Sequence, residues 1–175
     1  VNKSAEILAA NKLAWVNEQY IQSTPPEELA QHLERHLVKT AILPDDHGLS
    51  PQEIAKVIPC LNQRAKTLVE LAEKSAFFFK KEVEFDEKAR NKFLTEDARP
   101  LLEKVIVGFS TLDDFSAENI ETLFKKIVEE QGMKLGKLAQ PVRVALTGTT
   151  VSPGIYDVIL LLGKEETLKR LQNVV

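Results

Sequence analysis

A chain of 175 residues is long enough to bury one good hydrophobic core or two small ones. Its one cysteine, Cys60, excludes a disulfide framework and a Cys-rich metal site and favours a reducing compartment, while no apolar run approaches the roughly 18 to 20 residues of a membrane span. The net charge of −3 argues against a generally basic nucleic-acid binder, yet residues 132–175 carry +3 and the rest of the chain −6. We therefore expect positive potential near the C-terminal end. Because the chain begins with Val and not Met, we also expect it to be a fragment of a longer protein.

Helix signals dominate the first half of the sequence. Trp15 and Tyr20 stand at roughly helical spacing in KLAWVNEQY, which predicts a helix packed on a core. The stretch 23–40 begins with Ser23 or Thr24 as the expected N-cap and continues with Pro and Glu in the first turn. It then repeats leucine every four residues, at Leu29, Leu33 and Leu37.

A longer helical pattern covers residues 50–79. Ser50 followed by Glu53 is typical of a capping box, and the apolar positions after it fall on one stripe. Pro59 is expected to kink this helix or to split it in two, because proline cannot donate to the helical hydrogen-bond ladder. Cys60 lies next to it, with no base nearby in the sequence, and is expected to be a buried structural thiol.

The second half also reads as helix. FDEKARNKFL and TEDARPLLEKVIVGF predict a short helix and a longer one, and SAENIETLFKKIVEEQG predicts a helix that is capped by Ser116 and ends at Gly132. VRVAL and YDVILLL are short apolar runs that fit either strands or buried helices. Since no alternating pattern is sustained, we predict an all-α protein of about eight to ten helices. The acidic, turn-rich stretch near residues 80–88 predicts two small helical subdomains, 1–82 and 83–175.

Few residue groups favour catalysis or metal binding. His32 and His36 lie four residues apart on a predicted helix, a spacing that can hold zinc, but a third ligand is missing and exposed histidines are the simpler interpretation. Neither a GxGxxG nor a GxxxxGK[ST] loop is present, and the acids are scattered over helix faces. We therefore expect no catalysis, no metal and no cofactor in this chain.

The stretch from Lys134 to Glu166 combines apolar residues with turns and cations. Arg143 follows Gln140 by three residues, and the turn signals at Gly148, Pro153 and Gly154 come after it. Backbone displayed beside an arginine suits recognition of unstacked RNA bases, while the lysines and arginines around it suit phosphate. A protein-interaction surface explains the same features, and the residues alone leave both open. The candidate phosphate contacts are Lys134, Lys137, Lys164, Lys169 and Arg170.

Three blocks of the sequence resemble one known family. GKLAQPVRVALTGTTVSPGIYDVILLLGKEETLKRL, KLAWVNEQYI and LNQRAKTLVEL are similar, in the same order, to the C-terminal anticodon-binding domain of bacterial-type glutamyl-tRNA synthetases. The resemblance spans nearly the whole chain. It implies an all-helical cage that binds the anticodon stem-loop of the glutamate tRNA, with the glutamine tRNA as a further candidate. A helical module that recruits a synthetase or an amidotransferase is the alternative.

The resemblance also implies roles for individual residues. Arg64 matches an arginine that faces the first anticodon base, and Arg143 matches one near the third. The Pro-Gly turn of the family, which receives the second and third bases, corresponds here to Ser152, Pro153, Gly154 and Ile155. Related enzymes often have Thr and Leu in place of Ser152 and Ile155.

The catalytic HIGH and KMSKS motifs of that family are absent from this sequence. The resemblance therefore implies that aminoacylation with ATP and Mg²⁺ belongs to a catalytic domain joined in cis and not to this chain. It further implies a monomer that does not bind membranes, in the cytoplasm or in an organellar stroma or matrix.

Overall fold

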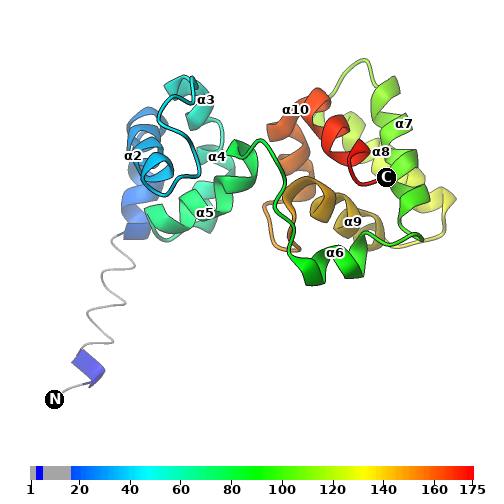
Figure 1. Cartoon of the computed structure of the whole chain (residues 1–175), viewed down its shortest axis with the longest axis horizontal. Helices are drawn as coiled ribbons and strands as arrows, with labels where there is room; N and C mark the ends of the chain where they lie inside the picture. The colour runs from blue at the N-terminus through cyan, green and yellow to red at the C-terminus, as the bar shows by residue number, and fades with distance from the viewer. Residues whose placement is uncertain (1–2, 6–16) are drawn as a thin grey trace. The chain divides into compact units, whose positions relative to one another are not determined.

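The structure is a computed structural model that describes residues 3–5 and 17–175, and every regular element in that part of the chain is helical (Figure 1). The all-α prediction is confirmed. The two ambiguous apolar runs are helices, since VRVAL lies in α9 and YDVILLL in α10. Trp15 and the first half of the KLAWVNEQYI block, residues 12–16, lie outside the described residues. The chain divides between Lys80 and Lys81 into two compact units, unit 1 and unit 2, each with its own packing.

Unit 1 consists of two longer helices, α2 and α5, with shorter helical pieces between them. Residues 17–23 are helical and precede α2. The helical stretch predicted after Ser50 is split rather than kinked, with Pro59 in the first turn of one of its pieces and a 3₁₀ turn after that piece. The elements are α2 (Pro26–Lys39), α3 (Pro51–Ala55), α4 (Ile58–Leu61), the 3₁₀ turn Asn62–Arg64 and α5 (Leu68–Phe79).

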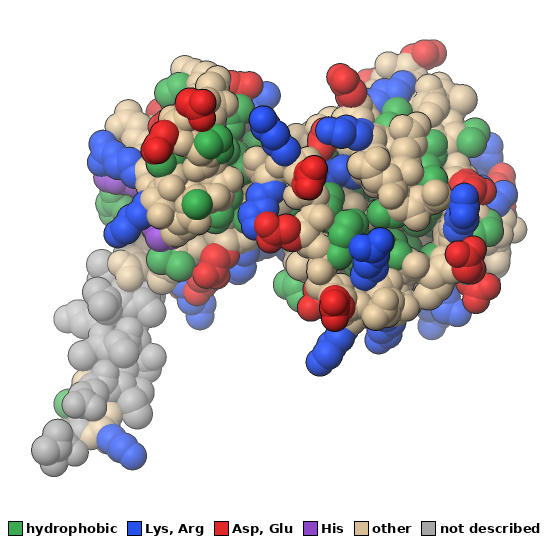
Figure 2. All heavy atoms as spheres, in the orientation of Figure 1, with side chains coloured by type: hydrophobic (Ala, Val, Ile, Leu, Met, Phe, Trp, Pro, Cys, Tyr) green, Lys and Arg blue, Asp and Glu red, His purple; other side chains and the backbone are tan. Residues whose placement is uncertain are grey.

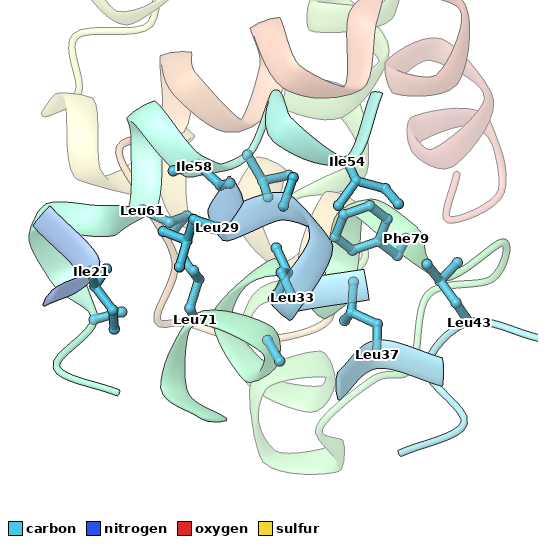
Figure 3. Close-up of a cluster of buried hydrophobic side chains, with 14 residues drawn as sticks. Ile21, Leu29, Leu33, Leu37, Leu43, Ile54, Ile58, Leu61, Leu71 and Phe79 are labelled. Atoms are coloured by element: carbon cyan, nitrogen blue, oxygen red, sulfur yellow. The ribbon is translucent and has the colours of Figure 1, made fainter. Parts of the chain in front are cut away.

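The core of unit 1 is built on the leucine repeat of α2. Leu29, Leu33 and Leu37 are fully buried, as their spacing predicts. α2 packs against α3, α4 and α5. Figure 3 shows the side chains that meet the α2 leucines from these neighbours, among them Ile54, Ile58, Leu61, Leu71 and Phe79.

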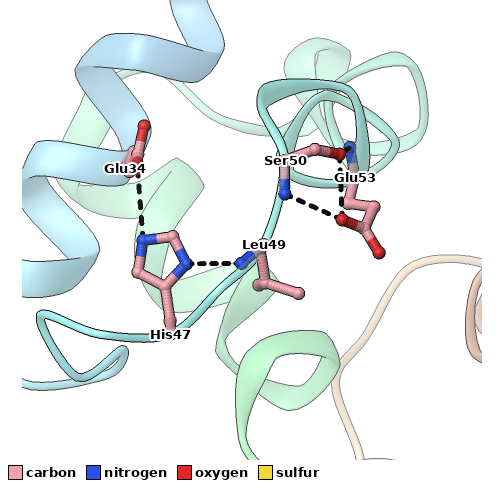
Figure 4. Close-up of polar contacts among 5 residues, drawn as sticks. All are labelled: Glu34, His47, Leu49, Ser50 and Glu53. Atoms are coloured by element: carbon pink, nitrogen blue, oxygen red, sulfur yellow. Dashed lines mark hydrogen bonds and ion pairs between the residues drawn. The ribbon is translucent and has the colours of Figure 1, made fainter.

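Polar contacts hold the entry to α3. The predicted capping box is present, because the Ser50 backbone N–H donates to Glu53 Oε2 at 2.7 Å and the Glu53 N–H donates to Ser50 Oγ at 3.3 Å (Figure 4). These hydrogen bonds lower the pKa of Glu53. His47 precedes the cap and accepts from the Leu49 N–H on Nδ1 at 3.0 Å, so its Nε2 carries the proton that is donated to Glu34 Oε1 at 3.1 Å.

The expected cap of α2 was wrong. Pro25 occupies the N-cap position without a side-chain hydrogen bond. Ser23 and Thr24 instead donate their hydroxyls to the Gln19 and Tyr20 carbonyls, at the end of the preceding helical residues. Hydroxyl side chains satisfy carbonyls as well as N–H groups, so the sequence alone did not determine which helix end they serve.

Replacing Leu33 tests whether unit 1 unfolds as a unit of its own. Leu33→Ala removes a fully buried side chain and should destabilise unit 1 by about 2 to 5 kcal/mol. If the units fold separately, amide hydrogen exchange should accelerate in residues 17–80 and remain unchanged in residues 81–175. Leu102→Ala, at a buried position of unit 2, should give the converse. Uniform acceleration throughout the chain would contradict the division into two subdomains.

Unit 2 is organised around α9. Its helices are α6 (Glu87–Phe93), α7 (Arg99–Thr111), α8 (Ala117–Glu130), α9 (Leu135–Thr147) and α10 (Ile155–Gln172). Helix α9 packs against each of the other four, and most of its residues from Leu138 onward are buried. Phe109, Phe124 and Tyr156 continue the core as a series of ring contacts between α7, α8 and α10. Of the cations in the Lys134–Glu166 stretch, Lys137 and Arg143 thus lie on the helix at the centre of unit 2, Lys134 is its N-cap residue and Lys164 lies on α10.

The end of α9 is fixed by the segment before α6. Gly148 ends the helix in the left-handed conformation, with φ 78°, and its carbonyl accepts from the Asp86 N–H at 2.9 Å. A Cβ atom at this position would lie 1.9 Å from the Glu84 carbonyl oxygen. Only glycine satisfies both the backbone conformation and the close approach. Residues 83–86 and the end of α9 are therefore held together at this position.

Substituting Gly148 should be costly. Gly148→Ala adds left-handed strain and a backbone overlap, and should destabilise unit 2 by at least about 2 kcal/mol. Gly136→Ala is the matched control, because this glycine lies inside α9 with nothing within 4 Å of its Cβ position, and the change should be neutral or stabilising by up to about 1 kcal/mol. Chemical denaturation measures both. Equal stability of the two variants would mean that the segment 83–86 moves to accept a side chain at little cost, and would contradict the requirement for glycine at position 148.

Candidate nucleic-acid interface

The structure joins Arg143 to the turn that connects α9 and α10. Arg143, half-buried on α9, donates its Nε–H to Ser152 Oγ at 2.8 Å. Ser152 in turn donates its hydroxyl to the Pro153 carbonyl at 2.8 Å. One hydroxyl both accepts and donates, so the guanidinium is held at a defined place beside the backbone of the turn. The sequence analysis named both residues as site candidates without predicting this contact, which gives the candidate site its centre.

Threonine side chains stabilise the turn, residues 148–154, from within. Thr147 donates its hydroxyl to the Arg143 carbonyl at 2.8 Å and accepts from the Thr149 N–H at 3.3 Å. Thr149 donates its own hydroxyl to the Val151 carbonyl at 2.8 Å. Such side-chain bonds replace helical backbone bonds where the chain reverses direction. The turn is a hydrogen-bonded structure that holds its backbone in place.

Only part of the predicted turn motif reaches the surface. Pro153 and Ile155 are buried, and Ser152 and Gly154 are half-buried. Val151, which the sequence analysis did not single out, is 82% exposed. An apolar side chain that directly precedes the motif and has no place in a helix pattern was the signal that could have identified it. Pro153 and Ile155 anchor the turn, while Thr149, Thr150 and Val151 are exposed.

The candidate phosphate contacts are scattered over unit 2. Lys134 and Lys137 are exposed at the start of α9, which puts them about 20 Å along the helix from the turn. Lys169 is exposed and pairs with Glu166 at 3.9 Å. On the face shown in Figure 2, Lys and Arg side chains are interspersed with Asp and Glu and do not form one continuous patch.

Two of those candidates have structural roles. Lys164 donates to the Leu112 carbonyl at 2.6 Å and so satisfies the C-terminal end of α7. Arg170 is 4% exposed and donates to the Leu146 carbonyl and to Glu166, each at 2.8 Å. A buried guanidinium committed to these acceptors is not offered to an external phosphate. We therefore withdraw Arg170 from the predicted phosphate contacts and assign Lys164 to the end of α7.

Arg64 belongs to unit 1 and lies at the end of the 3₁₀ turn. Its side chain is exposed, and its carbonyl accepts from the Lys74 ammonium. This contact fixes the backbone of the turn against α5. The predicted role of Arg64 toward a base stays a prediction.

Two buried polar atoms lie close in sequence to the Arg143–Ser152 contact. The Tyr156 hydroxyl, in the first turn of α10, and Gln140 Oε1, one turn before Arg143, are buried and have no hydrogen-bond partner among the described residues. Burial raises the pKa of the Tyr156 phenol, Glu121 adds to the rise and Lys125 opposes it. The phenol is thus neutral at physiological pH.

The other residues considered from sequence belong to unit 1. Cys60 is half-buried against the core of unit 1, and His32 and His36 are half-buried rather than exposed. Across residues 3–5 and 17–175, no three His, Cys, Asp or Glu side chains are grouped so as to hold a metal ion. The helices in this part of the chain are all too short or too polar to cross a membrane.

A comparison with models of known protein families places this chain in one of them. Residues 28–175 match the family model described as an anticodon binding domain. This match covers most of the chain, and the chain therefore belongs to the anticodon binding domain family.

Individual relatives make the resemblance more specific. A glutamate–tRNA ligase of Thermodesulfovibrio yellowstonii is 41% identical over 175 residues, which are 100% of this chain and 38% of that protein. One of Syntrophobacter fumaroxidans is 44% identical over 176 residues, 99% of this chain and 36% of that protein. The chain thus spans little more than a third of the length of these relatives. The resemblance predicted from the sequence is confirmed.

Solved structures agree with these relatives. The crystal structure of a glutamate tRNA ligase from Elizabethkingia meningosepticum, in complex with its amino acid, superimposes with a TM-score of 0.77 at 28% identity and covers 92% of this chain and 31% of that one. The glutamate-tRNA synthetase of Elizabethkingia anophelis gives 0.74, also at 28% identity, over 92% and 30%.

Tyr156→Phe tests the buried hydroxyl. Removing a buried group that has no partner should leave stability unchanged or raise it by up to about 1 kcal/mol at neutral pH. The folded state holds the phenol proton more tightly than the unfolded state. The stability that the parent protein gains from this tighter binding is fully present below the ordinary tyrosine pKa of about 10, and it is lost as the pH rises through the higher folded pKa. The variant should therefore lose less stability than the parent above about pH 10.

The control is Tyr20→Phe, at a tyrosine that is 48% exposed. Urea unfolding at several pH values measures all three proteins. A drop of more than about 1 kcal/mol in the stability of Tyr156→Phe at neutral pH would contradict the assignment, since it would reveal a hydrogen bond to this hydroxyl.

Proposed function

We propose that this chain binds the anticodon stem-loop of the glutamate tRNA, as the tRNA-recognition part of a glutamate–tRNA ligase. The observation that carries the proposal is the hydrogen bond from Arg143 to Ser152, which holds a guanidinium beside an exposed turn. Arginine forms bidentate hydrogen bonds with base edges and also stacks on unpaired bases. Family membership and the similarity to glutamate–tRNA ligases support the choice of RNA and of this tRNA.

In this proposal the residues divide into three roles. Arg143 and the displayed backbone of the turn contact the anticodon bases, and Arg64 of unit 1 contacts a further base. Pro153 and Ile155, both buried, keep the turn in shape. The exposed Lys134, Lys137 and Lys169 attract the RNA backbone. The base-specific contacts provide discrimination between tRNAs, and the lysines provide affinity that depends on salt.

The chemistry of the ligase would be supplied outside this chain. Attachment of glutamate to tRNA uses ATP and Mg²⁺, and we assign both to a catalytic domain in cis, because the chain corresponds to the C-terminal part of its relatives. We further propose that the ligase is a monomer that acts in the cytoplasm or in an organellar stroma or matrix. The glutamine tRNA is a further candidate, which the binding measurements below include.

Arg143→Ala should weaken binding to an RNA stem-loop that carries the glutamate anticodon by about 5- to 150-fold, because removing a good bidentate hydrogen-bonding pair has about this effect on discrimination in analogous DNA complexes. Ser152→Ala removes the support of the guanidinium and should weaken binding less. Ser152→Thr keeps the hydroxyl and should bind as the parent does. Fluorescence anisotropy against stem-loops with each anticodon base changed, including the glutamine anticodon, measures the affinities.

Lys137→Ala serves as the peripheral control and should weaken all stem-loops alike. If the parent chain binds every anticodon variant equally, the proposed function is wrong. Retention of a protein partner at a salt concentration that removes RNA would then favour the alternative of a protein-interaction module.

A further inference from the structure

A positively charged hollow lies in unit 2, between residues 81–90 and the C-terminal half of α10. Its volume is about 290 Å³. Cations outnumber acids in its lining, which includes Lys81, Arg90, Lys169, Arg170, Glu82 and Glu166. Two excess positive charges around a small concave space favour an anionic group.

The most deeply buried cation of the hollow, Arg170, forms an ion pair with Glu166. Arg170, which is 4% exposed, donates to Glu166 Oε1 at 2.8 Å, and Lys169 lies 3.9 Å from Glu166 Oε2. The Glu166 carboxylate is thus neutralised from both sides and does not repel an incoming anion. Arg170 serves as scaffold, and the recognition falls to the more exposed cations.

Arg90 is oriented for such a role. Its guanidinium carbon lies 5.0 Å from the centre of the Phe85 ring, in a cation–π contact. A guanidinium that lies over a ring keeps its N–H groups in its own plane, where they can bond the oxygens of a phosphate side by side. Lys81 and Lys169 are exposed on the same hollow, and their flexible stems allow them to add further donors.

The hollow adjoins the turn through a shared segment. Val83 and Phe85 line the hollow, while the residues between and after them, Glu84 and Asp86, hold Gly148. Arg170 also binds the Leu146 carbonyl, two residues before Gly148. The hollow and the start of the turn therefore share the short stretch of backbone at residues 83–86.

We propose that this hollow binds a phosphate group. The phosphate of an RNA strand whose bases lie at the turn is one source, and a free phosphate ion is the other. The RNA source rests on the proposed function, whereas the phosphate chemistry rests on the cations and does not depend on it. In the RNA case the contact is independent of base sequence, so it sets affinity next to the site that sets discrimination.

The test compares two double variants of the whole 175-residue chain. Lys81→Gln with Arg90→Gln removes two charges from the hollow, and Lys104→Gln with Lys126→Gln removes two from exposed positions on α7 and α8. Circular dichroism confirms that both are folded. Anisotropy titrations against the glutamate stem-loop and a base-changed stem-loop are run over a range of salt concentrations.

If RNA phosphate occupies the hollow, the first variant should bind both stem-loops about 5-fold more weakly at ~0.1 M salt for each phosphate interaction that the substitutions remove. The slope of log K against log salt should fall by about 0.7 for each of these interactions. The ratio between the two stem-loops should not change, and the control variant should keep the parent slope. Equal slopes in both variants would overturn the RNA source.

Inorganic phosphate tests the other source. Titration followed by amide NMR should shift resonances of residues 81–90 and 166–174 in the parent and not in the Lys81→Gln/Arg90→Gln variant. A chain that shows neither this response nor the slope change has no phosphate site here. A parent that does not discriminate anticodon bases, but loses salt dependence in the variant, would disprove the proposed function and leave the phosphate site standing.

Discussion

The candidate site depends on the close approach of Gly148 to the backbone of residues 84–86. At this contact α9 ends and the turn begins, and the segment 84–86 is hydrogen-bonded to the end of α9. The Asp86 N–H and the Gly148 carbonyl are both polar groups that must be paired when water is excluded, and each satisfies the other. A backbone-to-backbone contact keeps its geometry whatever the neighbouring side chains do. The turn can therefore vary in sequence while its starting point stays fixed.

Charge inside unit 2 serves the ends of helices. A helix leaves carbonyls without partners at its C-terminal end, and Lys164 and Arg170 supply donors at the ends of α7 and α9. Arg170 is buried, yet the desolvation of its charge is offset by Glu166 and by the Leu146 carbonyl. Some of the lysines and arginines that cluster in the sequence of unit 2 thus stabilise helix ends, and others are exposed on the surface. Fewer positive charges are available to an external ligand than the count of lysines and arginines suggests.

The sequence predicted the features that local rules determine. The leucine repeat of α2 and the capping box at Ser50 follow from spacing within one element, and both are present. The resemblance of their block to a known family also selected Arg143 and Ser152 as candidate site residues, whereas the hydrogen bond between them was seen only in the structure. What the sequence could not supply was the partner of each long side chain, because Lys164 binds a carbonyl 52 residues earlier in the chain. The burial of Pro153 and Ile155 was missed for the same reason, since it depends on helices distant in sequence.

Gly163 gives α10 a property that a continuous helix lacks. Its backbone leaves helical geometry, with φ 77° and ψ 170°, between two helical stretches. In an unbroken helix the position of a residue in the sequence determines the direction of its side chain around the helix axis, so the apolar faces at the two ends have a fixed relative orientation. The break at Gly163 removes this constraint. The half of α10 that follows the turn and the half that lines the hollow can therefore pack independently on their neighbours. Insertions or substitutions in one half then need no compensating change in the other.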